Sequence, residues 1–239
     1  MRRPFPPASD RAPTLRTIPF WKPGATTETT LTDRQREELA RIGTRLRLPA
    51  RTIIYREGAA AEWVFAIAEG ALKSYRDLPS GRRTIGAFLF ARDIFGLAEN
   101  GHYLYTLEAI TRVTLYRLPL GELKVLLKSD AEMQFKFLLK VTNELRESHM
   151  RALLMRRRDA PGRLATFLTM MEKKLGAPEN EDFALPMTRS DIAAFLGLSL
   201  ETVSRAAAAL ERRGLVEFPA RHRVRILDPR KMERLAAAV

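Results

Sequence analysis

The stretch that decides the fold is residues 187–205, which read MTRSDIAAFLGLSLETVSR. Thr188 and Asp191 stand three residues apart in front of an apolar run, the pattern of a capping box at a helix N-terminus. Gly197 is placed to take the positive φ that ends a helix, and Ser199 is placed to cap a second one. Two helices joined by a glycine-containing turn, the second longer, predict a helix-turn-helix.

The second helix of this pair is expected over residues 200–213, and its two faces differ. At about 100° per residue, one face is apolar and faces a core. The opposite face carries Glu201, Ser204, Arg205, Ala208 and Arg212. A carboxylate, a hydroxyl and a guanidinium suit the base edges of a DNA major groove. The alternative interpretation is an amphipathic helix whose polar face is simply solvated.

Downstream of this helix, residues 215–218 and 224–227 predict a hairpin whose turn is rich in arginine. Such a hairpin beside a helix-turn-helix is typical of a wing that lies near the phosphate backbone. Asp228 and Pro229 then predict the start of a closing helix. We expect the contacts that support a DNA interface from Thr188, Arg189, Ser199, Thr202, Arg212, Arg221 and Arg223.

Upstream lies a long helix, expected from Ala131 to about Arg156, with a seam of residues spaced alternately by four and three. The seam is Gln134, Leu138, Val141, Leu145, Ser148, Ala152 and Met155. This spacing is typical of two helices packed as a coiled coil. The sequence therefore predicts a homodimer held by Leu138, Val141, Leu145 and Ala152. The alternative is a helix that packs only on its own domain.

The region from Leu46 to Leu118 has a different sequence pattern, with short β-prone runs separated by turn residues. A spacing of about 8–12 residues between turns predicts an all-β sandwich or barrel. The expected strands are 52–55, 63–68, 71–76, 83–90, 104–109 and 113–118, flanked by helices at 34–43 and 120–127.

The whole chain is therefore expected to be α+β, in four parts. These are a proline-rich disordered arm (1–30), a β domain with flanking helices (31–128), a dimerisation helix (129–157) and a DNA-binding domain (158–239). Three further expectations concern the last part: a hinge at residues 156–162, a helix over residues 164–175, and an acidic loop at residues 178–182.

Composition narrows the class of function. The 239 residues include 41 Lys and Arg against 28 Asp and Glu, a net charge of +13, which favours a polyanionic partner. The chain contains no cysteine, which excludes disulfides, thiolate metal sites and a cysteine nucleophile. No apolar run approaches the roughly 18 residues of a membrane span, and no signal peptide is apparent. We therefore expect a cytoplasmic protein with no membrane partner. Because no P-loop, Ser-His-Asp or paired-carboxylate motif was found, an enzyme is the least supported class.

With these motifs in place, residues 35–235 resemble the CRP/FNR superfamily of bacterial transcription regulators, and residues 187–205 look most like its FixK-like branch. The resemblance implies a β-roll similar to a cyclic-nucleotide-binding domain, a dimerisation helix and a winged helix-turn-helix. It also implies that Glu201, Ser204 and Arg205 read a TTGA-type half-site in a near-palindromic operator. An activator of this kind would have RNA polymerase as a partner.

The same resemblance indicates which residues would hold a cyclic-nucleotide effector. The cyclic-nucleotide branch holds the ligand with Gly-Glu followed by Arg-Ser/Thr, whereas here Gly96 is followed by Leu97 and no arginine lies across the loop. A buried phosphate without a cation would be poorly compensated. Without cysteine, an iron–sulfur cluster is excluded too, so we expect no cofactor and no metal.

Two alternatives remain open at this stage. One is a ligand- or haem-gated sensor of the same architecture, for which the available histidines are His102, His149 and His222. The other is a basic architectural or RNA-binding protein that binds by charge alone, although the Glu201–Arg205 spacing argues against it.

Overall fold

The structure is a computed structural model that describes residues 31–98, 100–156, 159–178 and 181–237. Its first half is a β-roll of two four-stranded antiparallel sheets, in the strand orders β1-β8-β3-β6 and β2-β7-β4-β5. The strands are β1 (Thr44–Leu48), β2 (Ile53–Tyr55), β3 (Trp63–Glu69), β4 (Ala71–Asp77), β5 (Arg83–Phe90), β6 (Ile94–Phe95), β7 (Thr106–Ala109) and β8 (Val113–Pro119).

Both sheets contribute to the core of the β-roll. Phe65 and Leu115 from one sheet meet Leu72 and Leu107 from the other, and all four are buried. The six predicted strands are present, with small shifts at their ends, but the predicted strand 104–109 begins only at Thr106. Strands β1 and β6 were not predicted from the sequence. The two-residue β6 is too short to show a periodicity of two.

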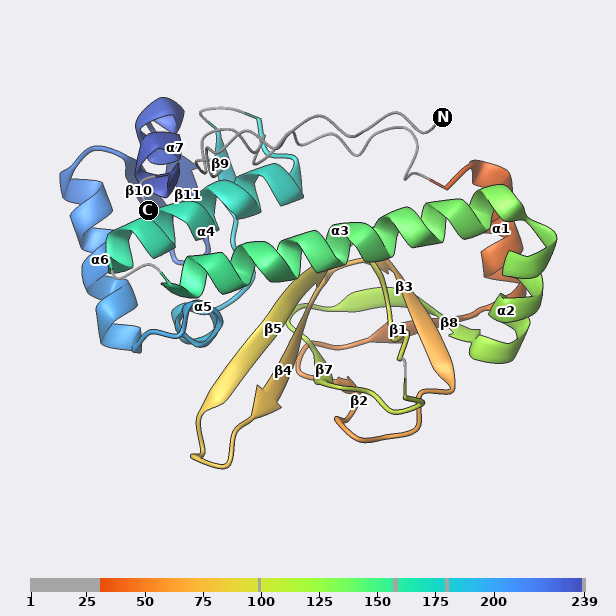
Figure 1. Ribbon diagram of the computed structural model, residues 1–239. Helices are drawn as coiled ribbons and strands as arrows, with labels where there is room; N and C mark the ends of the chain where they lie inside the picture. The colour runs from red at the N-terminus through yellow and green to blue at the C-terminus, as the bar shows by residue number, and fades with distance from the viewer. Residues whose placement is uncertain (1–30, 99, 157–158, 179–180, 238–239) are drawn as a thin grey trace, which may run out of the picture.

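Three helices cover one end of the β-roll (Figure 1). These are α1 (Asp33–Ile42), α2 (Leu120–Ser129) and the first turns of α3 (Ala131–Arg156). Leu39 of α1, Leu123 of α2 and Met133 of α3 pack with Val64 and Leu118 of the first sheet. The long helix α3 then runs across the β-roll and reaches the C-terminal unit, defined here as the elements from α4 to α7 (Figure 1).

Of the expected hinge at residues 156–162, the structure makes residues 160–162 the first turn of a helix, and Arg156 is the last residue of α3. Asp159 caps helix α4 (Ala160–Leu175), because its Oδ1 accepts the N–H of Gly162 at 2.5 Å. Pro161 lies in the first turn of α4, where its missing N–H would have had no partner within the helix. Pro161 and Gly162, which were expected to be part of the hinge, therefore belong to the start of a helix.

The rest of the C-terminal unit consists of helices around a small sheet. Its elements are β9 (Asp182–Ala184), α5 (Arg189–Leu196), α6 (Leu200–Arg212), β10 (Val216–Ala220), β11 (Arg223–Ile226) and α7 (Pro229–Ala237). The sheet has the order β10-β11-β9. The expected acidic loop therefore ends in a strand, because Phe183 pairs with Val224 and is buried. The predicted hairpin and closing helix are present.

The C-terminal unit and the β-roll share one hydrophobic cluster. Phe88 of β5 lies 6.0 Å from Phe167 of α4 and 5.3 Å from Phe195 of α5, measured between ring centroids. All three rings are buried. The two halves of the chain are therefore continuous in packing, although the change of pattern in the sequence suggests a boundary between them.

Two expectations remain, the disordered arm and the absence of a membrane span. The predicted arm, residues 1–30, lies outside the described residues. Within the described part, no single helix has both the length and the apolar character to cross a membrane. The bent pair α5–α6 meets those two criteria only when its helices are taken together, and Ile192, Phe195, Val203 and Leu210 are buried in the core of the C-terminal unit.

Candidate nucleic-acid interface

The helix-turn-helix forms as the sequence predicts, and each of its signals has a visible contact. Thr188 Oγ1 accepts the N–H of Asp191 at 3.1 Å, and Asp191 Oδ2 accepts the N–H of Thr188 at 3.0 Å. Gly197 adopts a left-handed φ of 64° after α5. Ser199 Oγ accepts the N–H of Thr202 at 3.1 Å and so caps α6. The chain bends by 100° between α5 and α6, within the range of about 90–120° for this motif.

Helix α6 presents the expected polar face to solvent. Val203 and Leu210 are buried on its inner side, with Ala206 and Ala207. On the outer side, the side chains of Glu201 and Arg205 are 76% and 72% exposed, and Arg205 Nη1 lies 3.4 Å from Glu201 Oε1. Ser204 is half-buried beside them. An exposed ion pair contributes little to stability. Glu201 and Arg205 can therefore separate and bind other polar groups at a small cost in free energy.

The hydroxyl groups expected to support the interface are largely used in capping. Ser199 Oγ lies 2.8 Å from Thr202 Oγ1, and Thr188 Oγ1 donates to Asp191 Oδ2 at 2.7 Å. Arg189 and Arg212 are exposed, at the first position of α5 and the last of α6. The two guanidinium groups therefore remain accessible to a phosphate, while the hydroxyls mainly fix the backbone.

The predicted wing is present, but its arginines differ in role. Arg223 Nη2 donates to the carbonyl oxygen of Asp182 at 2.7 Å, and its Nε pairs with the Asp182 carboxylate. This hydrogen bond from Arg223 lowers the pKa of Asp182. Arg223 therefore ties β11 to β9. Arg221, at the tip of the hairpin, is exposed and has no ion-pair partner among the described residues, so it is the wing cation accessible to phosphate.

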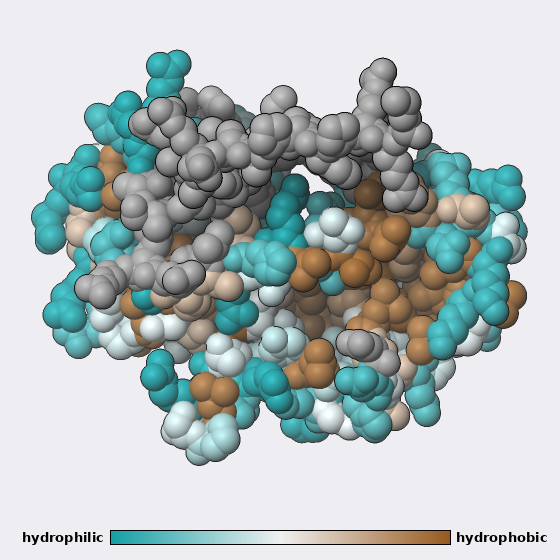
Figure 2. Space-filling model, in the orientation of Figure 1, coloured by the Kyte–Doolittle hydropathy of each residue, from teal (hydrophilic) through white to brown (hydrophobic). Residues whose placement is uncertain are grey.

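The predicted seam of α3 is an exposed apolar stripe. Leu138, Val141 and Leu145 are 60%, 45% and 56% exposed, and Ala152 is exposed further along the helix. Figure 2 shows hydrophobic residues gathered over the part of α3 that lies nearer to α1 and α2. Met155, the last residue of the seam, instead packs against the core of its own chain. The stripe that a second copy can cover therefore ends before Met155.

Two arginines that contact the core side of the helix-turn-helix were not predicted from the sequence. Arg163 of α4 donates to the carbonyl oxygens of Leu196 and Met155, at 3.0 and 2.9 Å. Arg151 of α3 donates to the carbonyl oxygen of Gly86 at 2.7 Å and lies 5.0 Å from the centroid of the Phe195 ring. No local pattern marks these arginines, because their partners lie in other elements.

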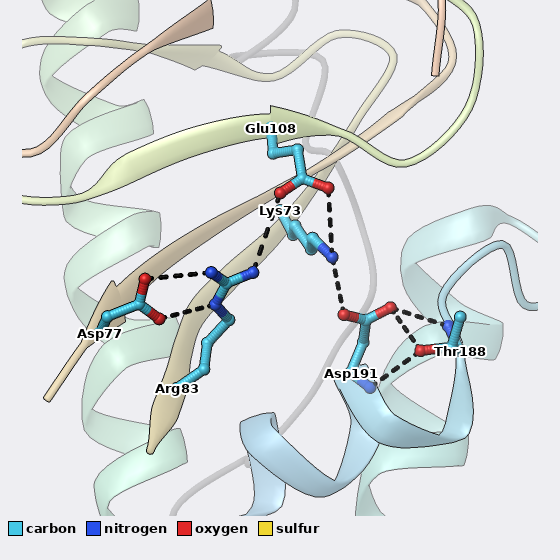
Figure 3. A network of polar contacts seen from close by, with 6 residues as sticks. All are labelled: Lys73, Asp77, Arg83, Glu108, Thr188 and Asp191. Carbon is cyan, nitrogen blue, oxygen red and sulfur yellow. Dashed lines mark hydrogen bonds and ion pairs between the residues drawn. The ribbon is translucent and has the colours of Figure 1, made fainter. Parts of the chain in front are cut away.

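One polar contact joins the β-roll to the cap of α5, and it was also missed. Lys73 Nζ of β4 lies 2.9 Å from Asp191 Oδ1 (Figure 3). Burial raises the pKa of Asp191, but hydrogen bonds from Lys73 and Thr188 outweigh it, so the pKa is lowered overall. The only signal in the sequence is a lysine that follows Ala71 and Leu72 in a predicted strand, and a charged residue in a core-forming strand usually needs a partner.

A cavity of about 490 Å³ lies where β-roll, α3 and α4 meet. The cations that line it are engaged by the protein itself. Lys140 Nζ donates to the carbonyl oxygen of Arg92 at 3.1 Å, and Lys174 Nζ donates to Glu147 Oε2 at 3.0 Å. Glu144 lines this cavity but keeps part of its side chain exposed, and desolvation there, with the nearby Asp93 and Glu147 carboxylates, raises its pKa to about 7.

The loop that corresponds to the phosphate-holding loop of the cyclic-nucleotide branch has a structural explanation for its glycine. Gly96 has a φ of 96°, and a Cβ atom there would lie 2.9 Å from the carbonyl oxygen of Trp63. Leu97, in the place of the acid, is 49% exposed. The turn therefore requires glycine whether or not a ligand binds.

The histidines considered for haem lie in three separate places. His102 Nδ1 is 3.1 Å from the carbonyl oxygen of Asn100, and His222 Nδ1 is 3.2 Å from that of Leu185. His149 is exposed on α3. Within the ranges that the structure describes, no group of three or more His, Asp or Glu side chains is arranged to hold a metal ion.

Comparison with known families agrees with this architecture. Residues 45–130 match the cyclic nucleotide-binding domain family, and residues 162–235 match the Crp-like helix-turn-helix domain family. The chain is 33% identical to the transcriptional activatory protein AadR of Rhodopseudomonas palustris over 84% of this chain and 85% of AadR. It is 30% identical to the nitrogen fixation regulation protein FixK of Azorhizobium caulinodans over 84% and 83% of the two chains.

A solved structure extends the likeness to three dimensions. The structure of FixK2 from Bradyrhizobium japonicum superimposes with a TM-score of 0.77 at 33% sequence identity. The match covers 83% of this chain and 99% of that one. Both halves of the chain therefore have counterparts in one solved relative.

Proposed function

Because the chain belongs to the CRP/FNR family of DNA-binding transcription regulators, with relatives of the FixK and AadR type, we propose that it is a homodimeric activator that reads a TTGA-type near-palindrome without a bound effector. The observation that carries this proposal is the exposed face of α6, where Glu201, Ser204 and Arg205 lie together outside the core.

The chemistry of that face suits one G·C pair of the half-site. A guanidinium donates two hydrogen bonds to O6 and N7 of guanine, and a carboxylate accepts from N4 of cytosine. Glu201 and Arg205 lie one turn apart and already face each other. This geometry supports binding of the cytosine by Glu201 and of the guanine by Arg205 within a single pair, with Ser204 on the same helix able to donate or accept.

The seam on α3 supports the dimer. A second copy would cover Leu138, Val141 and Leu145, whose exposed apolar surface is otherwise in water. A twofold dimer would present two α6 helices to major grooves about 34 Å apart, as a near-palindrome requires. Lysine and arginine contacts to phosphate would supply much of the affinity and make it dependent on salt.

The cations that line the cavity support the proposal that no effector is needed. Lys140, Arg151 and Lys174 are the cations that line it, and each has a hydrogen bond to the protein. A cyclic phosphate in this cavity would therefore have to compete with these hydrogen bonds for a cation. The regulator would act on chromosomal DNA in the cytoplasm and recruit RNA polymerase, which fits the activatory function in the name of AadR.

The test is binding of the purified chain, with no ligand added, to a TTGA…TCAA duplex and to a scrambled duplex. At about 1–3 kcal/mol for each base contact, Glu201→Ala and Arg205→Ala should each reduce the discrimination by about 5- to 150-fold. Arg34→Ala is a matched control, because Arg34 and Glu38 form the same kind of i,i+4 pair on α1. Equal affinity for the two duplexes, or unchanged discrimination in both α6 variants, contradicts the proposal.

A ligand-gated version of the same regulator is the second candidate, because a cavity of about 490 Å³ lies between the β-roll, α3 and α4. It requires that DNA binding depend on an added or copurified molecule. An ultraviolet–visible spectrum of the purified chain and operator titrations with and without cyclic AMP separate the two versions. Specific binding by colourless protein, unchanged by the nucleotide, favours the effector-free regulator over a haem- or cyclic-AMP-gated one.

A further inference from the structure

The capping carboxylate of α5 makes two different connections with its two oxygens (Figure 3). Asp191 Oδ2 accepts hydrogen bonds from the backbone N–H and the hydroxyl of Thr188, at 3.0 and 2.7 Å. Asp191 Oδ1 accepts from Lys73 Nζ at 2.9 Å, from a residue 118 positions earlier in the chain. The group that starts the helix-turn-helix is therefore also the group that attaches it to the β-roll.

On the β-roll side, the position of Lys73 is fixed by the sheet. Lys73 and Glu108 are cross-strand partners on β4 and β7, and Lys73 Nζ lies 3.5 Å from Glu108 Oε1. The other oxygen of Glu108 lies 4.0 Å from Arg83 Nη1. Arg83 in turn binds both oxygens of Asp77, at 2.7 and 3.0 Å. The chain of contacts in Figure 3 thus runs from the β4–β5 hairpin to α5.

Burial makes this attachment sensitive to the loss of either charge. The side chains of Lys73, Glu108 and Asp191 are only 13%, 15% and 13% exposed. Without Lys73, the two carboxylates would face each other with little water around them. Removal of one member of a buried ion pair is costly for that reason. The pair therefore has one strongly preferred arrangement.

The apolar contacts between the two halves constrain the orientation of α5 less than the Lys73–Asp191 ion pair does. Phe195 of α5 packs against Phe88, and Arg151 lies over its ring. Apolar contact is non-directional, so these contacts hold α5 against β5 but tolerate sliding and rotation. A hydrogen-bonded ion pair at the end of α5 has a required distance and angle. Together the two kinds of contact fix the orientation of α5, and α6 follows because the two helices share a core.

We propose that Lys73 is a positioning residue for DNA recognition, which holds the helix-turn-helix at a fixed orientation on its own β-roll through Asp191. The inference rests on the proposed function. In a twofold dimer, each α6 must meet its own groove at a set spacing. A recognition unit fixed in advance loses less freedom on binding, so both half-sites are engaged at lower entropic cost. Lys73 itself need not touch DNA.

The binding test compares a complete near-palindrome with a duplex that carries one half-site. Lys73→Met and Asp191→Asn should each weaken binding to the complete site by tenfold or more. Each should change half-site affinity and TTGA discrimination by less than about twofold. The double variant should be no weaker than the weaker single variant, because both remove one contact. Lys73→Arg keeps the charge and should restore most of the affinity.

Asp77→Asn is the matched control. It removes an ion pair on the same hairpin, but Asp77 is exposed and does not touch α5. It should leave both duplexes bound as in the original chain. Equal losses on the half-site and the complete site, or no loss in either Lys73→Met or Asp191→Asn, would overturn the proposal.

A second measurement does not depend on DNA. Because the chain has no cysteine, single cysteines can be introduced at Val125 of α2 and Arg230 of α7, both exposed, and spin-labelled. Labelled chain mixed with an excess of unlabelled chain gives the distance within one protomer. The distribution should be narrow in the original chain and in Asp77→Asn, and broad in Lys73→Met and Asp191→Asn.

The two measurements separate the two proposals. Broadened distances in a chain that binds no operator specifically would refute the proposed function while supporting the attachment by Lys73. Specific operator binding with narrow distances in every variant would support the function and refute the attachment. If Lys73→Met fails to fold, Asp191→Asn still decides the question, because it keeps the Lys73–Glu108 pair.

Discussion

The guanidinium of Arg189 lies 5.2 Å from the centroid of the Phe218 ring, so the first residue of α5 touches the first strand of the wing. Phe218 sits at the β-bulge between Glu217 and Ala220, and its N–H donates to Glu211 Oε1 at 3.4 Å. A bulge changes the direction of a side chain along a strand. Here it brings an aromatic ring beneath a cation that faces solvent.

This contact predicts how DNA binding should respond to salt. Arg189→Ala should lower the slope of log affinity against log salt by about 0.9, the value of one lost phosphate contact. Phe218→Leu should weaken binding about two- to fivefold through loss of a cation–π contact worth about 0.5–1 kcal/mol. Phe218→Leu should have no further effect in the Arg189→Ala background, and Phe218→Tyr should bind normally. An equal loss in both backgrounds would mean that Phe218 acts through the fold of the wing.

The stripe on α3 predicts the oligomeric state. Leu138→Glu and Leu145→Glu should each raise the dimer dissociation constant by at least tenfold, since a buried leucine contributes about 1.5–3 kcal/mol. Val125→Glu is the control, because Val125 is 69% exposed but lies on α2. Sedimentation equilibrium measures all three. Dimers of unchanged strength in both α3 variants would point to a different interface.

The shared aromatic cluster predicts that the two halves unfold together. Phe167 is completely buried and contacts Phe88 and Phe195. Phe167→Ala should lower the free energy of unfolding by about 3–5 kcal/mol. Denaturation followed by tryptophan fluorescence, to which Trp63 of the β-roll contributes, and by far-ultraviolet dichroism should show the same shifted midpoint. Val125→Ala should change neither. Separate midpoints would show that the cluster does not couple the halves.

The carboxyl group of Glu144 predicts a dependence of stability on pH. Its pKa in the folded chain is raised to about 7 by partial desolvation in the cavity and by Asp93 and Glu147, against the opposing charges of Lys174 and Lys140. The folded state therefore holds this proton more tightly than the unfolded state. Its contribution to stability is complete below the unfolded pKa of about 4.5 and is lost as pH rises through about 7.

Glu144→Gln should accordingly be more stable than the original chain at pH 8 and show no such gain at pH 5. Thermal unfolding at the two values of pH measures this, with Glu122→Gln on the exposed face of α2 as the control. An equal change in stability at both values of pH would exclude the carboxyl group as the cause.

The sequence predicted the parts of the fold whose signals are local. The capping box at Thr188 and Asp191, the left-handed Gly197 and the alternating buried and exposed faces of α6 depend on residues within one or two turns of each other. The start and end of α3 were also predicted, since its apolar spacing is regular over many turns. The strand β6 was missed because two residues cannot show a periodicity, and the helical start at Ala160 was missed because Pro161-Gly162 is also typical of a turn.

The part of the site that could not be predicted depends on contacts between distant residues. Lys73 and Asp191 meet only because β4 lies beside the start of α5. Arg223 was expected to face phosphate, but β9 brings Asp182 beside it. A single sequence shows that a buried lysine or an arginine in a wing needs a counter-charge. The choice of partner depends on how the elements are arranged in space.

The continuous packing of Phe88, Phe167 and Phe195 limits how this regulator can be recombined. A recognition unit transplanted onto a foreign sensor would need a new ring opposite Phe167 and a new cation opposite Asp191. Substitution on α6 carries no such requirement, because Glu201 and Arg205 are exposed. On the proposed function, new operator preferences would evolve by point changes on one helix face, whereas exchange of whole modules would demand matched changes on both sides.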